Sequence, residues 1–204
     1  MPARNAAFVA PALAPQERPS PSSTASPAAA NAQDHTAQTS FADKAQAFIQ
    51  SILPSVQSAA AALGVSPVAI LAQAALETGW GSHAPGNNLF GIKAGESWQG
   101  ASLSRLTQEF AGGAAEMGEA AFRAYQSAAD SVRNYAQMML GSPRYQDVRG
   151  HGDDIAGFAS ALQHSGYATD PHYARKLLAV AQSPTMRQAL AALGLSIGSS
   201  LATP

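Results

Sequence analysis

The 204-residue sequence contains no cysteine, which excludes a disulfide framework and thiolate metal sites. Its formal net charge is −1 and it has no basic run, so nothing in it indicates binding to nucleic acid or to an anionic membrane. It also lacks an apolar run of the roughly 18–20 residues needed to cross a bilayer. The 5 histidines are scattered along the chain, and we expect neither a metal nor a cofactor.

The first 40 residues have little apolar surface and a single aromatic residue, Phe8, among many prolines and alanines. Such a stretch cannot offset the entropy lost on folding, so we predict a disordered tail or linker over residues 1–40. Pro11 interrupts the apolar stretch near the N-terminus, and no Sec signal peptide is expected. We predict one folded domain over residues 41–195 and a frayed tail over residues 196–204.

Helix signals dominate the predicted domain. Ser66 is an expected N-cap followed by Pro67 at the first helical position, and Gly79 is expected to end that helix after Thr78. Ser127 and Asp130 form a capping pair for a later helix, and Asp170 followed by Pro171 repeats the cap-plus-proline pattern for another. The expected helices cover approximately residues 41–63 (kinked or split by Pro54), 67–78, 128–140, 153–164, 171–181 and 184–193.

The periodicity changes between residues 87 and 125. Residues 102–110 alternate as a strand does, and residues 121–125 fit a second strand after a turn at Gly112–Gly113. One side of the first expected strand presents Leu103, Arg105, Thr107 and Glu109, and the other presents Leu106 and Phe110. We therefore predict a predominantly helical α+β fold with a small hairpin lobe.

The helix that begins at Pro67 presents a carboxyl group among apolar side chains. Gln73 is the only polar residue between Pro67 and Glu77, and a helix that is apolar nearly all round is normally buried. Burial raises the pKa of a carboxyl, and the C-terminal end of a helix acts in the same direction. A glutamic acid that stays protonated near neutral pH can protonate the leaving oxygen of a glycosidic bond. A glutamate that caps a neighbouring loop, or one that pairs with Lys93 or Arg123, fits the same pattern.

Trp80 lies between two glycines directly after this carboxyl group. Sugar rings have apolar faces that stack on aromatic rings, and glycines let a backbone approach closely. Trp80 is therefore a candidate sugar-binding residue, with a position in the core as the alternative.

Five groups of residues occur in an order typical of a known family. They are Ala74-Ala-Leu-Glu-Thr-Gly-Trp-Gly81, Asn88-Leu-Phe-Gly-Ile-Lys93, Thr107-Gln-Glu109, Phe122-Arg-Ala-Tyr125, and Gly166-Tyr-Ala-Thr-Asp-Pro171 with Tyr173-Ala-Arg-Lys-Leu177. Over about residues 45–182 the sequence resembles the glucosaminidase domain of flagellar peptidoglycan hydrolases of the FlgJ type, in glycoside hydrolase family 73. The resemblance implies a lysozyme-like fold, with a groove between a helical body and a β-lobe. It also implies endo-β-N-acetylglucosaminidase activity on peptidoglycan.

The resemblance also assigns roles to individual residues. The catalytic candidates are Glu77, Glu109 and Tyr167, and the substrate-binding candidates are Trp80, Asn88, Phe90, Tyr125 and Tyr173. An exposed strand glutamate is the alternative for Glu109, and a half-buried core tyrosine is the alternative for Tyr167. The sequence does not rank Tyr167 against Tyr173. Some flagellar relatives have an aspartate where this chain has Asn134, so we expect no third catalytic carboxyl there.

The expected partner is the peptidoglycan glycan strand, with flagellar rod proteins as a second candidate, and we expect a monomer. This substrate implies a periplasmic or cell-wall location, reached without an obvious Sec signal and with the flagellar export apparatus as a candidate route. Residues 1–40 are too short for the rod-capping domain of dual-function relatives, so a flagellar role follows only from the resemblance. The alternatives are a lytic transglycosylase, a muramidase, and a wall-binding module without turnover.

Overall fold

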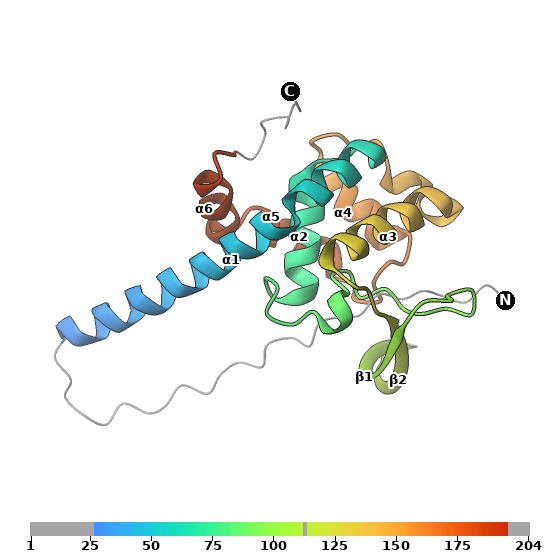
Figure 1. Cartoon of the computed structure of the whole chain (residues 1–204), viewed down its shortest axis with the longest axis horizontal. Coiled ribbons are helices and arrows are strands. Elements are labelled where there is room, and N and C mark those ends of the chain that lie inside the picture. The colour runs from blue at the N-terminus through green and yellow to red at the C-terminus, as the bar shows by residue number, and fades with distance from the viewer. Residues whose placement is uncertain (1–26, 112–113, 196–204) are drawn as a thin grey trace.

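The computed structural model describes residues 27–111 and 114–195 (Figure 1). The helices are α1 (Pro27–Leu63), α2 (Pro67–Thr78), α3 (Ala128–Gly141), α4 (Ile155–His164), α5 (Tyr173–Ala181) and α6 (Pro184–Ala192), with short 3₁₀ helices at Pro85–Asn87 and Pro143–Val148. The strands β1 (Ser102–Ala111) and β2 (Ala114–Arg123) form an antiparallel hairpin. The predicted predominantly helical α+β fold is confirmed. No helix within these described ranges is long and apolar enough to cross a membrane.

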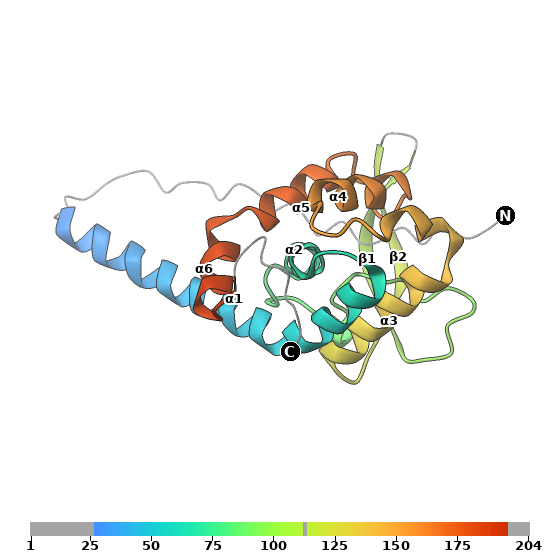
Figure 2. The ribbon, with the colours of Figure 1, turned by 90° about the horizontal axis from the view of Figure 1, so that it is seen from above.

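Helix α2 lies at the centre of the helical body. Figure 2 views it nearly along its axis, with other helices around it, and it contacts α1, α4 and α5. Its side chains from Val68 to Ala75 are all buried, as expected for a helix that is apolar on every side. Gly79 ends the helix in the left-handed conformation (φ 55°), and its N–H donates to the carbonyl of Ala75.

Helix α1 begins earlier than the sequence pattern predicted. We expected a start near Phe41, but the helix begins at Pro27. The alanines and glutamines of this stretch have good helix propensity and continue the helix outward from the part that packs on the body. Figures 1 and 2 show this end projecting beyond the other helices. Pro54 does not split the helix, and residues 1–26 lie outside the described residues.

The β-hairpin is longer than expected. Its second strand begins at Ala114 rather than near residue 121, and Thr107 pairs with Gly118 in its middle. Leu106 is 71% exposed whereas the neighbouring Thr107 is buried, which agrees with the predicted alternation of sides. The expected turn at Gly112–Gly113 lies outside the described residues.

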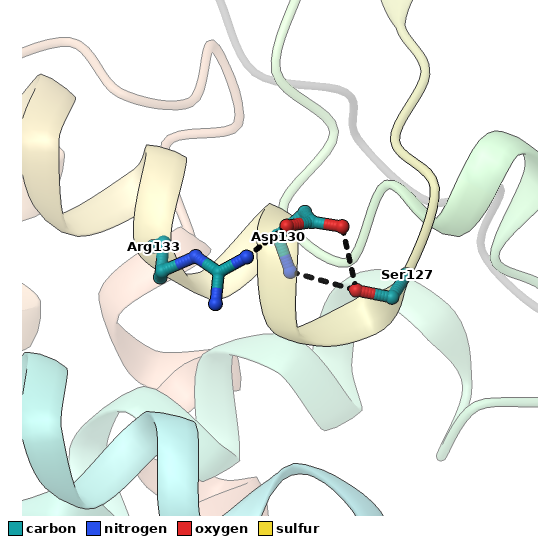
Figure 3. Close-up of polar contacts among 3 residues, drawn as sticks. All are labelled: Ser127, Asp130 and Arg133. Atoms are coloured by element: carbon teal, nitrogen blue, oxygen red, sulfur yellow. Dashed lines mark hydrogen bonds and ion pairs between the residues drawn. The ribbon is translucent and has the colours of Figure 1, made fainter.

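A serine cap begins α3, as the sequence indicated. The Ser127 hydroxyl oxygen accepts a hydrogen bond from the Asp130 N–H (3.1 Å), and the hydroxyl donates to the Asp130 carboxylate (2.7 Å). Figure 3 shows these contacts together with the ion pair between Asp130 and Arg133. The hydrogen bond to the backbone satisfies one of the N–H groups that the first turn of a helix leaves without a partner.

The start of α5 differs slightly from the prediction. The helix begins at Tyr173 rather than at Pro171, because Asp170 holds a turn that precedes it. One Asp170 carboxylate oxygen accepts from the His172 N–H (2.8 Å), and the other pairs with Lys176 (2.6 Å). This turn fixes where the first residue of α5 lies.

Replacing Ser127 with alanine should lower the free energy of unfolding by about 1 kcal/mol, because the first turn of α3 loses its cap. Urea unfolding of the full chain measures this loss. Arg133→Ala is the matched control, since it removes only an exposed ion pair of α3 and should leave the unfolding midpoint nearly unchanged. An unchanged midpoint for Ser127→Ala would contradict the assignment of the cap.

Candidate active site

A cleft lies between the helical body and the hairpin lobe, next to the C-terminal end of α2. The body and the segment after α2 contribute Glu77, His83, Pro85, Asn88 and Gly91, and the lobe contributes Leu103, Arg105 and Phe122. Leu103 and Arg105 come from the side of β1 that the alternation grouped with Glu109. In this cleft an acidic side chain, Glu77, and a cationic side chain, Arg105, therefore lie among apolar side chains.

Glu77 is a buried carboxyl group at the edge of this cleft. Its side chain is 7% exposed, and the Tyr173 hydroxyl donates a hydrogen bond to Oε1 (2.9 Å). Burial raises the pKa of Glu77 to about 8, and the hydrogen bond from Tyr173 offsets part of that rise. Glu77 is therefore largely protonated at neutral pH, as its position in an apolar helix predicted.

Of the two tyrosines that the sequence could not rank, Tyr173 contacts the acid. It is the first residue of α5, so the Asp170 turn determines its position. Tyr167 is also buried, but its hydroxyl donates to the carbonyl of Phe90 (2.6 Å), and its ring lies 5.9 Å from that of Tyr173. Tyr167 thus packs beside Tyr173, and its hydroxyl binds the Phe90 carbonyl rather than the Glu77 carboxyl.

A second polar pair lies behind Tyr173 in the core. The Tyr135 hydroxyl donates to Oε1 of Gln73 (2.7 Å), and both side chains are buried. Burial raises the pKa of Tyr173, and the nearby Gln73 side chain opposes that rise. Gln73 was singled out as the only polar residue between Pro67 and Glu77, but nothing in the sequence near Tyr135 indicates a contact with Gln73, 62 residues away.

Two other expected substrate-binding residues, Phe90 and Asn88, contact groups within the protein. Phe90 is fully buried and stacks on Tyr135 (4.1 Å between ring centroids), so its ring does not face the cleft and the expectation for it is corrected. Asn88 lines the cleft, but its amide nitrogen donates to the carbonyls of Ile92 and Arg123 (both 2.9 Å). Asn88 therefore joins the body to the end of β2.

Trp80 lies in a tight turn after α2 and packs against α1. Its backbone has φ 60°, and its half-buried ring meets the ring of Phe41 edge to face (6.3 Å). The flanking Gly81 is needed here, because a Cβ at this position would lie 2.4 Å from the ring of Phe48. The ring is half-buried and its partner Phe41 is exposed, so the sugar-binding role of Trp80 stays a prediction.

Tyr125 belongs to a cluster at the root of the lobe. Its hydroxyl and the Arg123 guanidinium both donate to the amide oxygen of Asn134 (2.9 and 2.7 Å), and Arg123 lies over the ring of Trp98 (4.5 Å). Burial raises the pKa of Tyr125 to about 12, and Arg123 opposes that rise. Because Arg123 has these partners, the alternative in which it pairs with Glu77 is not observed.

A contact across the cleft was not anticipated from the sequence. Nη2 of Arg105 on β1 lies 2.7 Å from Nε2 of His83, in the segment after α2. Glu109 lies further along β1, opposite Glu116, but its side chain is outside the described part of the structure. The role of Glu109 therefore stays a prediction.

A helical body, a hairpin lobe and a buried glutamic acid in the cleft between them define a lysozyme-like glycoside hydrolase. The chain belongs to the glucosaminidase family. The family model described as mannosyl-glycoprotein endo-beta-N-acetylglucosaminidase matches residues 53–185. Among the residues that the structure describes, no cluster of three or more His, Cys, Asp or Glu side chains could hold a metal ion.

Similar proteins agree with the resemblance seen in the sequence. The chain is 43% identical to the peptidoglycan hydrolase FlgJ of Pseudomonas aeruginosa over 157 residues, which are 74% of this chain and 39% of that relative. A crystal structure of a peptidoglycan hydrolase mutant from Sphingomonas sp. A1 is 42% identical with a TM-score of 0.69, over 72% of this chain and 99% of that one. The glycoside hydrolase domain of Salmonella typhimurium FlgJ, C-terminally truncated, is 37% identical with a TM-score of 0.56, over 68% and 95%. The chain thus spans less than half the length of the full FlgJ relative.

Replacing Tyr173 with phenylalanine should raise the pKa of Glu77, because a hydrogen bond that lowers it is lost. The protonated form then persists to higher pH, so the alkaline limb of kcat/KM for glycan cleavage should move upward from about pH 8. The rate constant kcat should fall by about tenfold, since the acid is less well oriented.

Tyr167→Phe is the matched control for this measurement. It removes the hydroxyl that binds the Phe90 carbonyl, so it should reduce stability by about 1–3 kcal/mol and leave the alkaline limb in place. If the limb moves with Tyr167→Phe and not with Tyr173→Phe, the assignment of the two tyrosines is reversed.

Proposed function

We propose that this chain cleaves peptidoglycan glycan strands as an endo-β-N-acetylglucosaminidase, with Glu77 as the general acid. The observation that supports this most directly is a buried carboxyl group, 7% exposed, that borders the cleft, and its burial raises the pKa of Glu77 to about 8. General acid catalysis is most efficient when the pKa of the acid lies near the working pH. The relatives named as peptidoglycan hydrolases support the choice of substrate.

In this mechanism Glu77 protonates the glycosidic oxygen while the bond from that oxygen to the anomeric carbon breaks. Positive charge develops on the sugar as in an oxocarbenium ion, and Glu77 becomes a carboxylate. The Tyr173 hydroxyl stabilises this carboxylate through its hydrogen bond to Oε1. The same bond holds the carboxyl in one orientation throughout the reaction.

Three routes complete the reaction. Glu109 could activate a water molecule for inversion, or attack the anomeric carbon for retention, or stand aside while the substrate's own acetamido group attacks. Inversion releases the opposite anomer from the other two routes, so the configuration of the new reducing end distinguishes it from them. A covalent adduct on Glu109 would separate the two retaining routes.

The cellular setting follows from the same proposal. Peptidoglycan as substrate places the protein in the periplasm or at the cell wall. Similarity to FlgJ supports flagellar rod proteins as partners and the flagellar apparatus as the export route. A monomer is sufficient, because the cleft is formed within one chain.

Mass spectrometry of digested peptidoglycan tests the reaction. Wild-type protein should release fragments with reducing N-acetylglucosamine ends, and Glu77→Gln should lower their yield by about 10²–10⁴-fold because the proton donor is lost. Glu119→Gln, on the exposed outer side of the lobe, is the matched control and should retain activity.

Other products would overturn the proposal in specific ways. Reducing N-acetylmuramic acid ends would indicate a muramidase, and 1,6-anhydro ends would indicate a lytic transglycosylase. Wild-type protein that binds peptidoglycan but releases no fragments would indicate a wall-binding module.

A further inference from the structure

Two pairs of buried polar side chains lie between the core and the Glu77 carboxyl. The Tyr135 hydroxyl donates to Oε1 of Gln73 (2.7 Å), and the Tyr173 hydroxyl donates to Oε1 of Glu77 (2.9 Å). Gln73 precedes Glu77 by four residues on α2, so the two side chains lie on the same face of that helix. Helix α5, which begins with Tyr173, packs against α2. The two hydrogen-bonded pairs are therefore neighbours.

The amide nitrogen of Gln73 is the open position between these pairs. The Gln73 side chain is fully buried, and among the described residues its Nε2 has no hydrogen-bond partner in ordinary geometry. A buried amide N–H without an acceptor is unfavourable, so such a group is normally placed beside one. The Gln73 side chain opposes the rise in the pKa of Tyr173 that burial causes. A donor stabilises a phenolate oxygen and an acceptor destabilises it, so this effect of Gln73 is that of its Nε2 amino group.

We propose that Gln73, held by Tyr135, is a positioning residue that directs the hydroxyl proton of Tyr173 onto Glu77. A tyrosine hydroxyl has one proton to donate and an oxygen that accepts. When Nε2 of Gln73 donates to the Tyr173 oxygen, the hydroxyl proton is left for the Glu77 carboxyl. Because Oε1 of Gln73 accepts from Tyr135, the amide cannot turn its acceptor toward Tyr173 without losing that hydrogen bond.

This chain of side chains acts on Glu77 when the acid gives up its proton. Hydrogen bonds in series polarise one another, so a Tyr173 oxygen that accepts from Gln73 makes its own hydroxyl a stronger donor. The stronger donor stabilises the Glu77 carboxylate that forms when the glycosidic oxygen takes the proton. The chain thus limits the rise in the pKa of Glu77 that burial causes. The inference deepens the proposed function and rests on it for the reaction, whereas the effect on the pKa of Glu77 does not require turnover.

The pH at which Glu77 loses its proton tests the chain directly. Infrared difference spectra between each protein and its Glu77→Gln form follow the band of the protonated carboxyl as the pH rises. The double variant Gln73→Met with Tyr135→Phe removes both polar groups together, so neither partner is left unsatisfied in the core. The band should then persist to a pH about half a unit higher, as expected for loss of one neutral hydrogen bond. Tyr135→Phe alone should cause a smaller rise, because the amide is then free to turn.

The same variants in a Tyr173→Phe background distinguish positioning from a general change in packing. Without the Tyr173 hydroxyl, Gln73 has no hydrogen-bonded route to the acid. The double variant should therefore leave the pKa of Glu77 where Tyr173→Phe alone puts it. In the protein that keeps Tyr173, kcat for glycan cleavage should fall while KM stays unchanged, because the chain orients the acid and does not bind the glycan.

Ser131→Ala is the matched control for disturbance of the core. The Ser131 side chain is fully buried, and its hydroxyl accepts from the Leu89 N–H (3.0 Å), outside the chain that leads to the acid. This variant should unfold at a lower urea concentration than wild type. The Glu77 band should still disappear at the wild-type pH.

The proposal fails if the double variant raises the pKa of Glu77 equally with and without the Tyr173 hydroxyl, because Gln73 would then act without Tyr173. It fails as well if the pKa is unchanged in both backgrounds. Wild-type digestion of peptidoglycan separates these failures from failure of the proposed function. Active wild-type protein without the rise that depends on Tyr173 would overturn the positioning role alone. Inactive wild-type protein that shows this rise would overturn the hydrolase and leave the positioning of Tyr173 intact.

Discussion

The desolvation of one carboxyl group at the end of α2 is the constraint on which the site depends. A charged carboxylate with few solvent contacts is unfavourable, so Glu77 keeps its proton to a pKa of about 8. The burial requires a central helix without a polar side, and the surrounding helices supply the cover. Tyr173 limits the rise in the pKa of Glu77 by donating a hydrogen bond to its carboxyl group, so the acid can still lose its proton during a reaction. One packing arrangement thus sets both the stability of the body and the chemistry at its edge.

The lobe is attached to this body mainly through uncharged acceptors. The amide of Asn88 binds backbone groups of Ile92 and Arg123, and the amide oxygen of Asn134 accepts from Arg123 and Tyr125. These contacts fix the root of the hairpin, whereas the Arg105–His83 contact lies across the cleft. The root of the lobe is therefore joined to the body by several hydrogen bonds.

Local sequence signals predicted the parts of the structure that local physics determines. Ser127 caps α3 and Gly79 ends α2, because each outcome depends on residues within a turn or two. The burial of Glu77 was indicated by the apolar pattern of its own helix, although other helices supply the cover. The extension of α1 back to Pro27 was missed because composition alone does not distinguish a disordered alanine-rich stretch from a helix continued from a packed one. Contacts between segments far apart in the sequence were not predicted either. Nothing in the sequence near Tyr173 or Tyr167 indicates which phenol contacts Glu77, which is 96 residues away from Tyr173. Phe90 belongs to a family motif, although its ring packs in the core.

Direct observation of the Glu77 proton tests the central claim. Infrared difference spectra between wild type and Glu77→Gln, recorded from pH 4 to pH 10, isolate the carbonyl stretch of this one carboxylic acid. The protonated band should persist through neutral pH and disappear as the pH rises through about 8. A band that disappears near the ordinary glutamate pKa of about 4.3 would show that Glu77 is ionised at neutral pH, and the proposed acid could not then donate a proton.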